Sequence, residues 1–315
     1  MQGVLLRIFA FAVPVLFASL IAWWGGSSYA PSGETSNRVV LYSKLQTVKE
    51  YNALFAYLHY KWPMRSSAVV PAISIEKLPG DLRKIRNISE RKSLFFRMIL
   101  PIVLMENDVL SKQRAKVLRL FENPLPEKGS DDRLWLDALV KEYRVDGDIG
   151  SKKIQEELLV RLDEVPVAMT LAQAANESNW GVSRFTRLGN SLFGQWTYRK
   201  SNGVVPERRD AGLRHAVLSF GSIRDSVREY FFNLNVGFAY EKFREIRRQM
   251  RAQGKSLNAV ELSEGLTRYS ARGAEYVEEI QYMIEDNGLD QLQNPKLHYF
   301  NPVAIYSVID FNIHK

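Results

Sequence analysis

Apolar residues recur at helical spacing along most of the chain, whereas segments with strand-like alternation are rare. The helical spacing covers about 41–62, 131–144, 151–162 and 166–181. The apolar run 94–105 has the length of a buried core helix, and we expect it to kink or restart at Pro101. Alternation typical of strands is confined to about 192–220, and 63–79 is expected to be an irregular connection. The pattern predicts a mainly α-helical protein.

The N-terminal region contains an uncharged apolar segment. Residues 8–24 carry no charge, and Arg7 is the only charged residue before them. Such a segment is typical of a secretory signal or a membrane anchor. At about 1.5 Å per residue it just reaches across a hydrocarbon core. Small residues at 28–30 suit a signal peptidase, but Pro31 and the Trp23–Trp24 pair favour retention. We expect an exported protein, and these residues are compatible both with removal of the segment by a signal peptidase and with its retention as an anchor.

Composition and charge exclude several classes of protein. The chain has 315 residues, 46% hydrophobic and 25% charged, which is ordinary for one large or two modest globular domains. It has no cysteine, which excludes disulfide scaffolds, cysteine zinc sites, iron–sulfur clusters and thiol nucleophiles. The four histidines lack metal-ligand spacing, so no metal site is predicted. A net charge of +8 favours anionic partners.

Five basic residues follow one another closely in a single predicted helix. They are Lys242, Arg244, Arg247, Arg248 and Arg251. Such a strip can meet wall carboxylates or lipid headgroups, but a solvated face is the more common outcome and is the one expected here.

One acidic residue falls in an apolar helix. Pro166 is well placed as the first helical residue and Gly181 as the stop. Glu177 then lies in the last turn, where burial and the negative end of the helix dipole both raise a carboxyl pKa. Aromatic residues follow at Trp180, Phe185, Phe193, Trp196 and Tyr198. A protonated acid among aromatic walls suits a glycosidase, which protonates a leaving oxygen. The same residues are also compatible with a surface carboxylate beside a core.

Two motifs around this residue resemble a known signature. Residues 174–185 read Ala-Ala-Asn-Glu-Ser-Asn-Trp-Gly-Val-Ser-Arg-Phe, and residues 189–196 read Gly-Asn-Ser-Leu-Phe-Gly-Gln-Trp. Together they resemble the peptidoglycan glucosaminidase family, most closely its Bax-like branch, and the resemblance extends over about 82–290. It implies a lysozyme-like helical domain with a small β lobe. It also implies hydrolysis of the β-1,4 bond after N-acetylglucosamine, without a cofactor.

The resemblance also implies roles for individual residues. Glu177 matches the family's catalytic acid. The matching supporting and substrate-binding positions are Ser178, Trp180, Asn190, Phe193, Trp196, Tyr269 and Tyr276. The chain departs from the common pattern in two places. Ser191 stands where many members have a second asparagine, and the 269–276 segment is one residue longer and lacks the usual aspartate.

A second carboxylate is harder to assign. Glu207 and Asp210 are flanked by Arg208 and Arg209, which would keep them ionised and able to assist catalysis. A solvated charged turn fits the same residues equally well. Glu275 is a weaker candidate, and the acetamido group of the substrate is a further alternative.

The expected organisation has four parts. These are a signal peptide or anchor helix over 1–30, an extension of unknown role over 31–81, the glucosaminidase domain over 82–290 with its catalytic core from about 150, and a tail over 291–315. We expect a periplasmic protein, soluble or held at the inner membrane through residues 4–24, that binds peptidoglycan strands and not nucleic acid. The alternatives are an inactive wall-binding protein and a membrane-tethered envelope scaffold. The sequence does not set the oligomeric state.

Overall fold

The computed structural model describes residues 40–43, 45–64, 69–197, 203–204, 216–292 and 295–300. The apolar N-terminal segment and the candidate residues Glu207 and Asp210 therefore lie outside the described residues. Within the described part of the chain, no helix combines the length and the apolar character needed to cross a bilayer.

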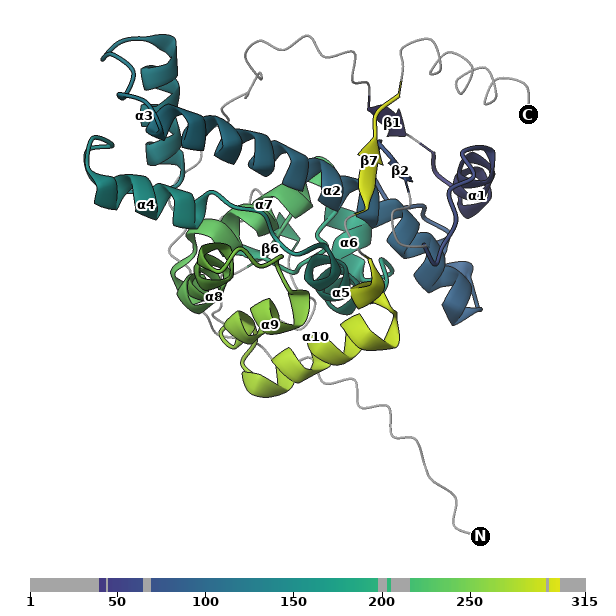
Figure 1. The fold of residues 1–315 in the computed structure, drawn as a ribbon. Helices are drawn as coiled ribbons and strands as arrows, with labels where there is room; N and C mark the ends of the chain where they lie inside the picture. The colour runs from purple at the N-terminus through teal and green to yellow at the C-terminus, as the bar shows by residue number, and fades with distance from the viewer. Residues whose placement is uncertain are drawn as a thin grey trace.

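The longest helix, α2 (Ile88–Phe121), runs through the body of the molecule (Figure 1). The side chain of Asn87 caps its first turn by accepting a hydrogen bond from the backbone N–H of Glu90. The predicted restart at Pro101 is wrong, because the helix continues through this residue. Pro101 costs the helix one backbone hydrogen bond. It lies in a fully buried stretch, so core packing holds the helix together there.

Eight further α-helices follow within the described part of the chain. They are α3 (Asp131–Glu142), α4 (Lys152–Arg161), α5 (Val167–Ser178), α6 (Arg184–Gly189), α7 (Ile223–Val236), α8 (Glu241–Ala252), α9 (Ala259–Ser263) and α10 (Ala274–Asp286). The predicted helices corresponding to α3, α4 and α5 are confirmed, and so is the mainly helical class. Both α2 and α10 pack against α5, which is therefore enclosed by other elements (Figure 1).

The N-terminal part of the described chain corrects two predictions. Residues 41–62 do not form one helix, because β1 (Leu41–Ser43) precedes α1 (Val48–Tyr57). The helix begins there because Thr47 and Glu50 form a reciprocal capping box. The expected irregular connection contains β2 (Val69–Pro71) and β3 (Ile73–Ile75). The strand β1 pairs in parallel with β3, and β2 with β7 (Lys296–His298). Strands of three residues carry too little alternation for a sequence pattern to detect.

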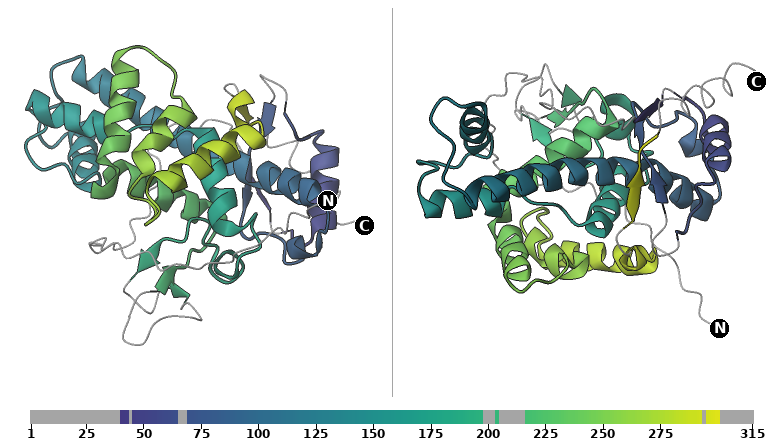
Figure 2. Two further views of the ribbon diagram at one scale, coloured as in Figure 1. Left: turned by 90° about the horizontal axis from the view of Figure 1, so that it is seen from below. Right: turned by 45° about the horizontal axis from the view of Figure 1, so that its top comes forward.

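A small antiparallel sheet confirms the strands expected between 192 and 220. It contains β4 (Trp196–Thr197), β5 (Gly203–Val204) and β6 (Ala216–Leu218), with β6 in the centre. The left view of Figure 2 shows this sheet projecting from the helices.

The basic strip lies on α8, but the expectation that it is a solvated face is wrong for two of its five members. Arg247 is 1% exposed and donates hydrogen bonds to the backbone oxygens of Val160 and Glu164, both at 2.9 Å. Arg244 is also buried and donates to the backbone oxygens of Leu234 and Gly237. Two buried arginines on one helix therefore bind backbone carbonyls in the last turns of α4 and α7 and in the residues that follow these helices.

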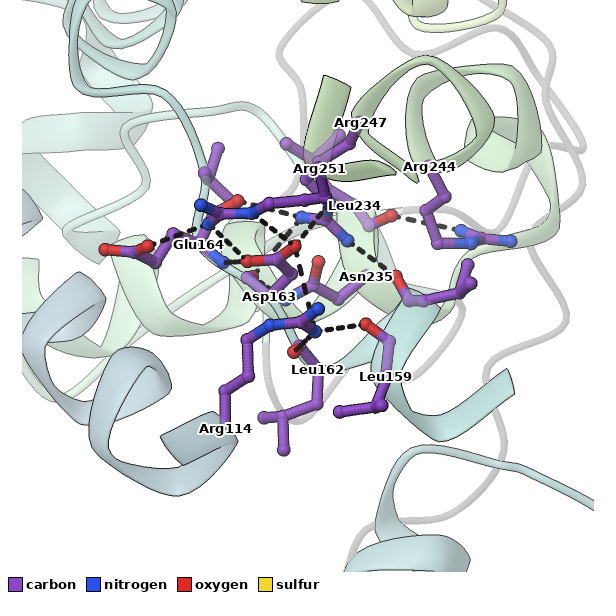
Figure 3. Close-up of polar contacts among 12 residues, drawn as sticks. Arg114, Leu159, Leu162, Asp163, Glu164, Leu234, Asn235, Arg244, Arg247 and Arg251 are labelled. Carbon is purple, nitrogen blue, oxygen red and sulfur yellow. Dashed lines mark hydrogen bonds and ion pairs between the residues drawn. The ribbon is translucent and has the colours of Figure 1, made fainter. Parts of the chain in front are cut away.

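A buried carboxylate organises the same region (Figure 3). Asp163 accepts two hydrogen bonds from Arg251, at 3.1 and 2.7 Å, and lies 3.7 Å from the guanidinium of Arg114. Burial alone raises the pKa of Asp163, but Arg251, Arg247 and Arg114 outweigh it and hold that pKa below its usual range. The cluster ties α2 and α8 to the segment that leads into α5.

Candidate active site

The end of α5 is built to present Glu177. After Ser178, both Asn179 and Trp180 have left-handed backbone angles, with φ of 48° and 59°. Gly181 follows with a φ of 80°, and a Cβ there would lie 2.6 Å from the Leu78 side chain. The predicted stop at Gly181 is wrong by three residues, because the helix ends at Ser178 and the left-handed Asn179 is its C-cap. Pro166 is the N-cap instead of the first helical residue.

Ser178 holds this turn together. Its hydroxyl donates to the backbone oxygen of Ala174 and accepts from the backbone N–H of Gly181, at 2.5 and 2.8 Å. The residue is fully buried. Ser178 is therefore not accessible to a substrate in this geometry. Its two hydrogen bonds stabilise the end of α5, which accounts for a serine at this position of the motif.

Trp180 is anchored on α2. Its ring packs edge-on against Phe95 and Phe96, at centroid distances of 6.0 and 5.4 Å, and Lys92 lies over its face. It is half-buried. These contacts fix the left-handed turn that follows Glu177 against the longest helix.

A chain of buried hydrogen bonds ends on the Glu177 carboxyl. The hydroxyl of Tyr276 donates to Glu177 Oε1 at 2.8 Å. Gln173 Nε2 donates to the same hydroxyl at 2.9 Å, and Gln173 Oε1 accepts from Tyr230. Because Gln173 supplies a donor to the Tyr276 oxygen, the single hydroxyl proton of Tyr276 is left for Glu177. The network therefore sets the direction of the bond that Glu177 receives.

Aromatic rings from separate segments form the wall beside this carboxyl. Tyr269 stacks on Tyr276 at 5.2 Å, and Tyr240 packs on Tyr269 at 6.2 Å. Phe193 stacks on Tyr230 at 3.9 Å, and its backbone oxygen accepts a hydrogen bond from Tyr269. The structure thus brings Glu177 together with three of the predicted positions, Phe193, Tyr269 and Tyr276.

The surroundings of Glu177 favour its neutral form. Burial is the largest influence and raises the pKa of Glu177 to about 7. The Tyr276 hydrogen bond lowers this pKa, and so, more weakly, does the positive charge of Arg272. The negative charge of Glu279 raises it. Glu279 is itself held by Asn176, at 3.4 Å, and by Arg272. A carboxyl with this pKa can give up a proton near neutral pH.

The other predicted residues have different positions. Asn190 is buried in a left-handed turn with a φ of 52°, and its amide donates to the backbone oxygen of Phe220, so it shapes the chain after α6. Trp196 is half-buried on β4. Glu275 is exposed in the first turn of α10. Among the described residues, no group of three or more potential ligands is placed to hold a metal ion.

Sequence reasoning missed five contributors to this site. They are Gln173, Tyr230, Tyr240, Arg272 and Glu279. The position of Gln173 could have indicated its role, because it lies four residues before Glu177 and therefore on the same face of an apolar helix. The other four come from distant segments, and their local sequence gave no sign of their role.

Comparison with known proteins identifies the family. Residues 155–289 match the family model Glucosaminidase, described as mannosyl-glycoprotein endo-β-N-acetylglucosaminidase. Protein bax of Escherichia coli (strain K12) is 30% identical over 209 residues, which cover 66% of this chain and 73% of that protein. The chain belongs to the Bax-like glucosaminidase family.

The region matched by the glucosaminidase model contains the whole site described above, from Gln173 to Glu279. A solved structure, the catalytic domain of the autolysin Auto from Listeria monocytogenes, is 16% identical and covers 57% of this chain and 96% of that chain. Its TM-score of 0.32 is too low to carry an argument about fold or activity.

Proposed function

We propose that this Bax-like glucosaminidase is a peptidoglycan hydrolase in which Glu177 is the general acid. The bond cleaved is the β-1,4 bond after N-acetylglucosamine. The observation that carries the proposal is the environment of Glu177. Its carboxyl lies among aromatic rings, accepts a hydrogen bond from Tyr276, and has a pKa raised to about 7. Glycosidases need an acid that stays protonated near neutral pH, and apolar aromatic surroundings favour the protonated form. Most of these rings are buried, so Tyr269, which is half-buried, is the ring of this group that is available to a sugar.

The hydrogen-bond pattern indicates which oxygen delivers the proton. Tyr276 donates to Oε1 of Glu177, so the acid proton belongs on Oε2. Transfer of that proton to the glycosidic oxygen breaks the bond and leaves a carboxylate on Glu177. The Tyr276 hydrogen bond and the positive charge of Arg272 then stabilise the new anion.

A second group has to stabilise the sugar cation or activate water. Glu207 and Asp210 are the proposed candidates, since they fall between β5 and β6 of the small sheet. Their neighbours Arg208 and Arg209 favour the ionised form. The substrate's acetamido group is the alternative nucleophile. A lysozyme-like arrangement, with the helical acid facing the β lobe, is part of this proposal.

The proposal includes a location. The apolar residues 8–24 fit export to the periplasm, with or without retention at the inner membrane through residues 4–24. Peptidoglycan strands are the proposed partner, and the excess of basic residues suits an anionic polymer.

Analysis of newly formed reducing ends tests this function. Full-length protein in detergent is incubated with purified peptidoglycan, and the products are reduced with borohydride and examined by mass spectrometry. We expect reduced N-acetylglucosamine ends. Glu177→Gln should lower their rate of formation by about 10²–10⁴-fold, whereas Glu278→Gln, an exposed carboxyl on α10, should leave it unchanged. Reduced muramic acid ends would move the cut to the other bond. No new ends, with binding retained, would support the wall-binding alternative.

A further inference from the structure

An exposed aromatic ring and an exposed arginine lie together at the rim of the tyrosine wall. Phe238 is 66% exposed, a large value for phenylalanine, and belongs to the 3-10 turn η3 (Phe238–Tyr240). The guanidinium of Arg268 lies over its ring, 5.4 Å from the centroid. Arg268 is itself exposed and, within the described part of the chain, has no carboxylate partner.

This pair is continuous with the candidate active site. Tyr240, two residues after Phe238, packs on Tyr269, and Tyr269 directly follows Arg268. Tyr269 stacks in turn on Tyr276, which donates a hydrogen bond to Glu177. The two segments that form the wall therefore also carry the exposed pair, one or two residues before the wall tyrosines.

The chemistry of the pair fits an anionic, partly apolar ligand. A guanidinium stacked on a ring keeps its N–H edge free for two parallel hydrogen bonds to a carboxylate. The exposed part of the phenylalanine ring offers a flat apolar surface for the adjoining chain. Neither feature contributes to the core, since both side chains are exposed.

We propose that Phe238 and Arg268 form a subsite for a carboxylate of the peptides that are attached to the glycan strands. The inference rests on the proposed function and goes beyond it, because it predicts selection for peptide-bearing over bare glycan. Bare polymers of N-acetylglucosamine carry no carboxylate. Glycan from which the peptides have been removed carries only the carboxylate of the muramic acid.

Binding measurements on a catalytically blocked protein test the subsite without depending on turnover. Full-length Glu177→Gln protein, alone or with Arg268→Gln or Phe238→Ala, is titrated calorimetrically with three soluble ligands. These are peptide-bearing glycan fragments, the same fragments after removal of the peptides, and chitin oligosaccharides. The charge control is Lys49→Gln, an exposed residue on α1, well away from α8 and α9 (Figure 1).

We expect Arg268→Gln to weaken binding of the peptide-bearing fragments by about fivefold, as suits one exposed ion pair. Phe238→Ala should weaken it similarly, and Lys49→Gln should leave it unchanged. The other two ligands should bind all variants equally. Equal losses for all three ligands, a loss that persists after the peptides are removed, or no difference between variants would each overturn the subsite. A protein that shows the expected pattern but cleaves no peptidoglycan would refute the hydrolase function alone.

Discussion

Two carboxyl groups at opposite ends of the same helix, the buried Asp163 and the half-buried Glu177, have opposite pKa shifts. Asp163 precedes α5 and is met by Arg114, Arg247 and Arg251, so its pKa is held low. Glu177 lies in the last turn of α5 and receives one neutral hydrogen bond, from Tyr276, so burial raises its pKa to about 7. Their positions relative to the helix dipole favour the same difference.

The comparison separates a structural carboxylate from a reactive one. Desolvation is the largest influence on the pKa of both groups, so desolvation alone does not identify a catalytic group. The number of positive partners decides the outcome, because a compensated carboxylate stays ionised and an uncompensated one keeps its proton. The compensated end of α5 holds the helix in place, and the uncompensated end is available for chemistry.

Neutralising the compensated carboxylate should have the largest effect on stability. Asp163→Asn keeps the shape of the side chain but removes the anion that faces the buried Arg247 and Arg114, while Arg251 keeps its ion pair with Glu164. We expect the free energy of unfolding to fall by about 3–5 kcal/mol, measured by urea denaturation at pH 7. The control is Asp137→Asn, an exposed ion-pair partner of Arg133, which should cost less than about 1 kcal/mol. Equal losses from the two substitutions would contradict the structural role of the cluster.

Neutralising the uncompensated carboxyl should stabilise the protein at high pH. The folded-state pKa of Glu177 is raised, so ionisation between pH 4.5 and pH 7 costs the native state more than the unfolded state. Glu177→Gln should therefore gain about 1–3 kcal/mol at pH 8. At pH 4, where the native carboxyl is already neutral, the two proteins should be about equally stable. A gain that does not vary with pH would show that charge is not its cause.

Removing the hydroxyl from Tyr276 should move the pH profile of activity upward. Its hydrogen bond favours the ionised form of Glu177, so Tyr276→Phe raises the pKa of the acid further. The alkaline limb of kcat/KM should move to higher pH, and kcat at pH 6 should fall about 10–100-fold because the developing anion loses its donor. A limb that moves to lower pH would contradict the assigned direction of this bond.

Neutralising Glu279 should shift the same limb the other way, with a smaller effect on rate. Its negative charge raises the pKa of Glu177, and its loss also frees Arg272. Both changes favour the carboxylate, so the alkaline limb of Glu279→Gln should move to lower pH. The control is Glu285→Gln, further along α10 and exposed, which should not move the limb. Opposite shifts for Tyr276→Phe and Glu279→Gln would be hard to obtain from general loosening of the site.

Local features of the sequence predicted the helices and the position of Glu177. Helical spacing and the turn residues around Gly181 are encoded within one segment, so α3, α4 and α5 could be predicted directly. The partners of Asp163 could not, because Arg247 and Arg251 lie more than eighty positions away and fit a solvated basic helix equally well. Sequence separation also concealed Tyr230 and Glu279, which lie 57 positions from Gln173 and 103 positions from Asn176.

Measuring the protonation of the Glu177 carboxyl as a function of pH tests the central claim most directly. The side-chain carboxyl carbons of glutamate are labelled with ¹³C, and their NMR shifts are followed from pH 4 to pH 9 in the full-length protein. Glu177→Gln identifies the signal by its absence. We predict a titration midpoint near pH 7 for this signal. A midpoint near the ordinary value of about 4.5 would contradict the proposal that Glu177 is held protonated as a general acid.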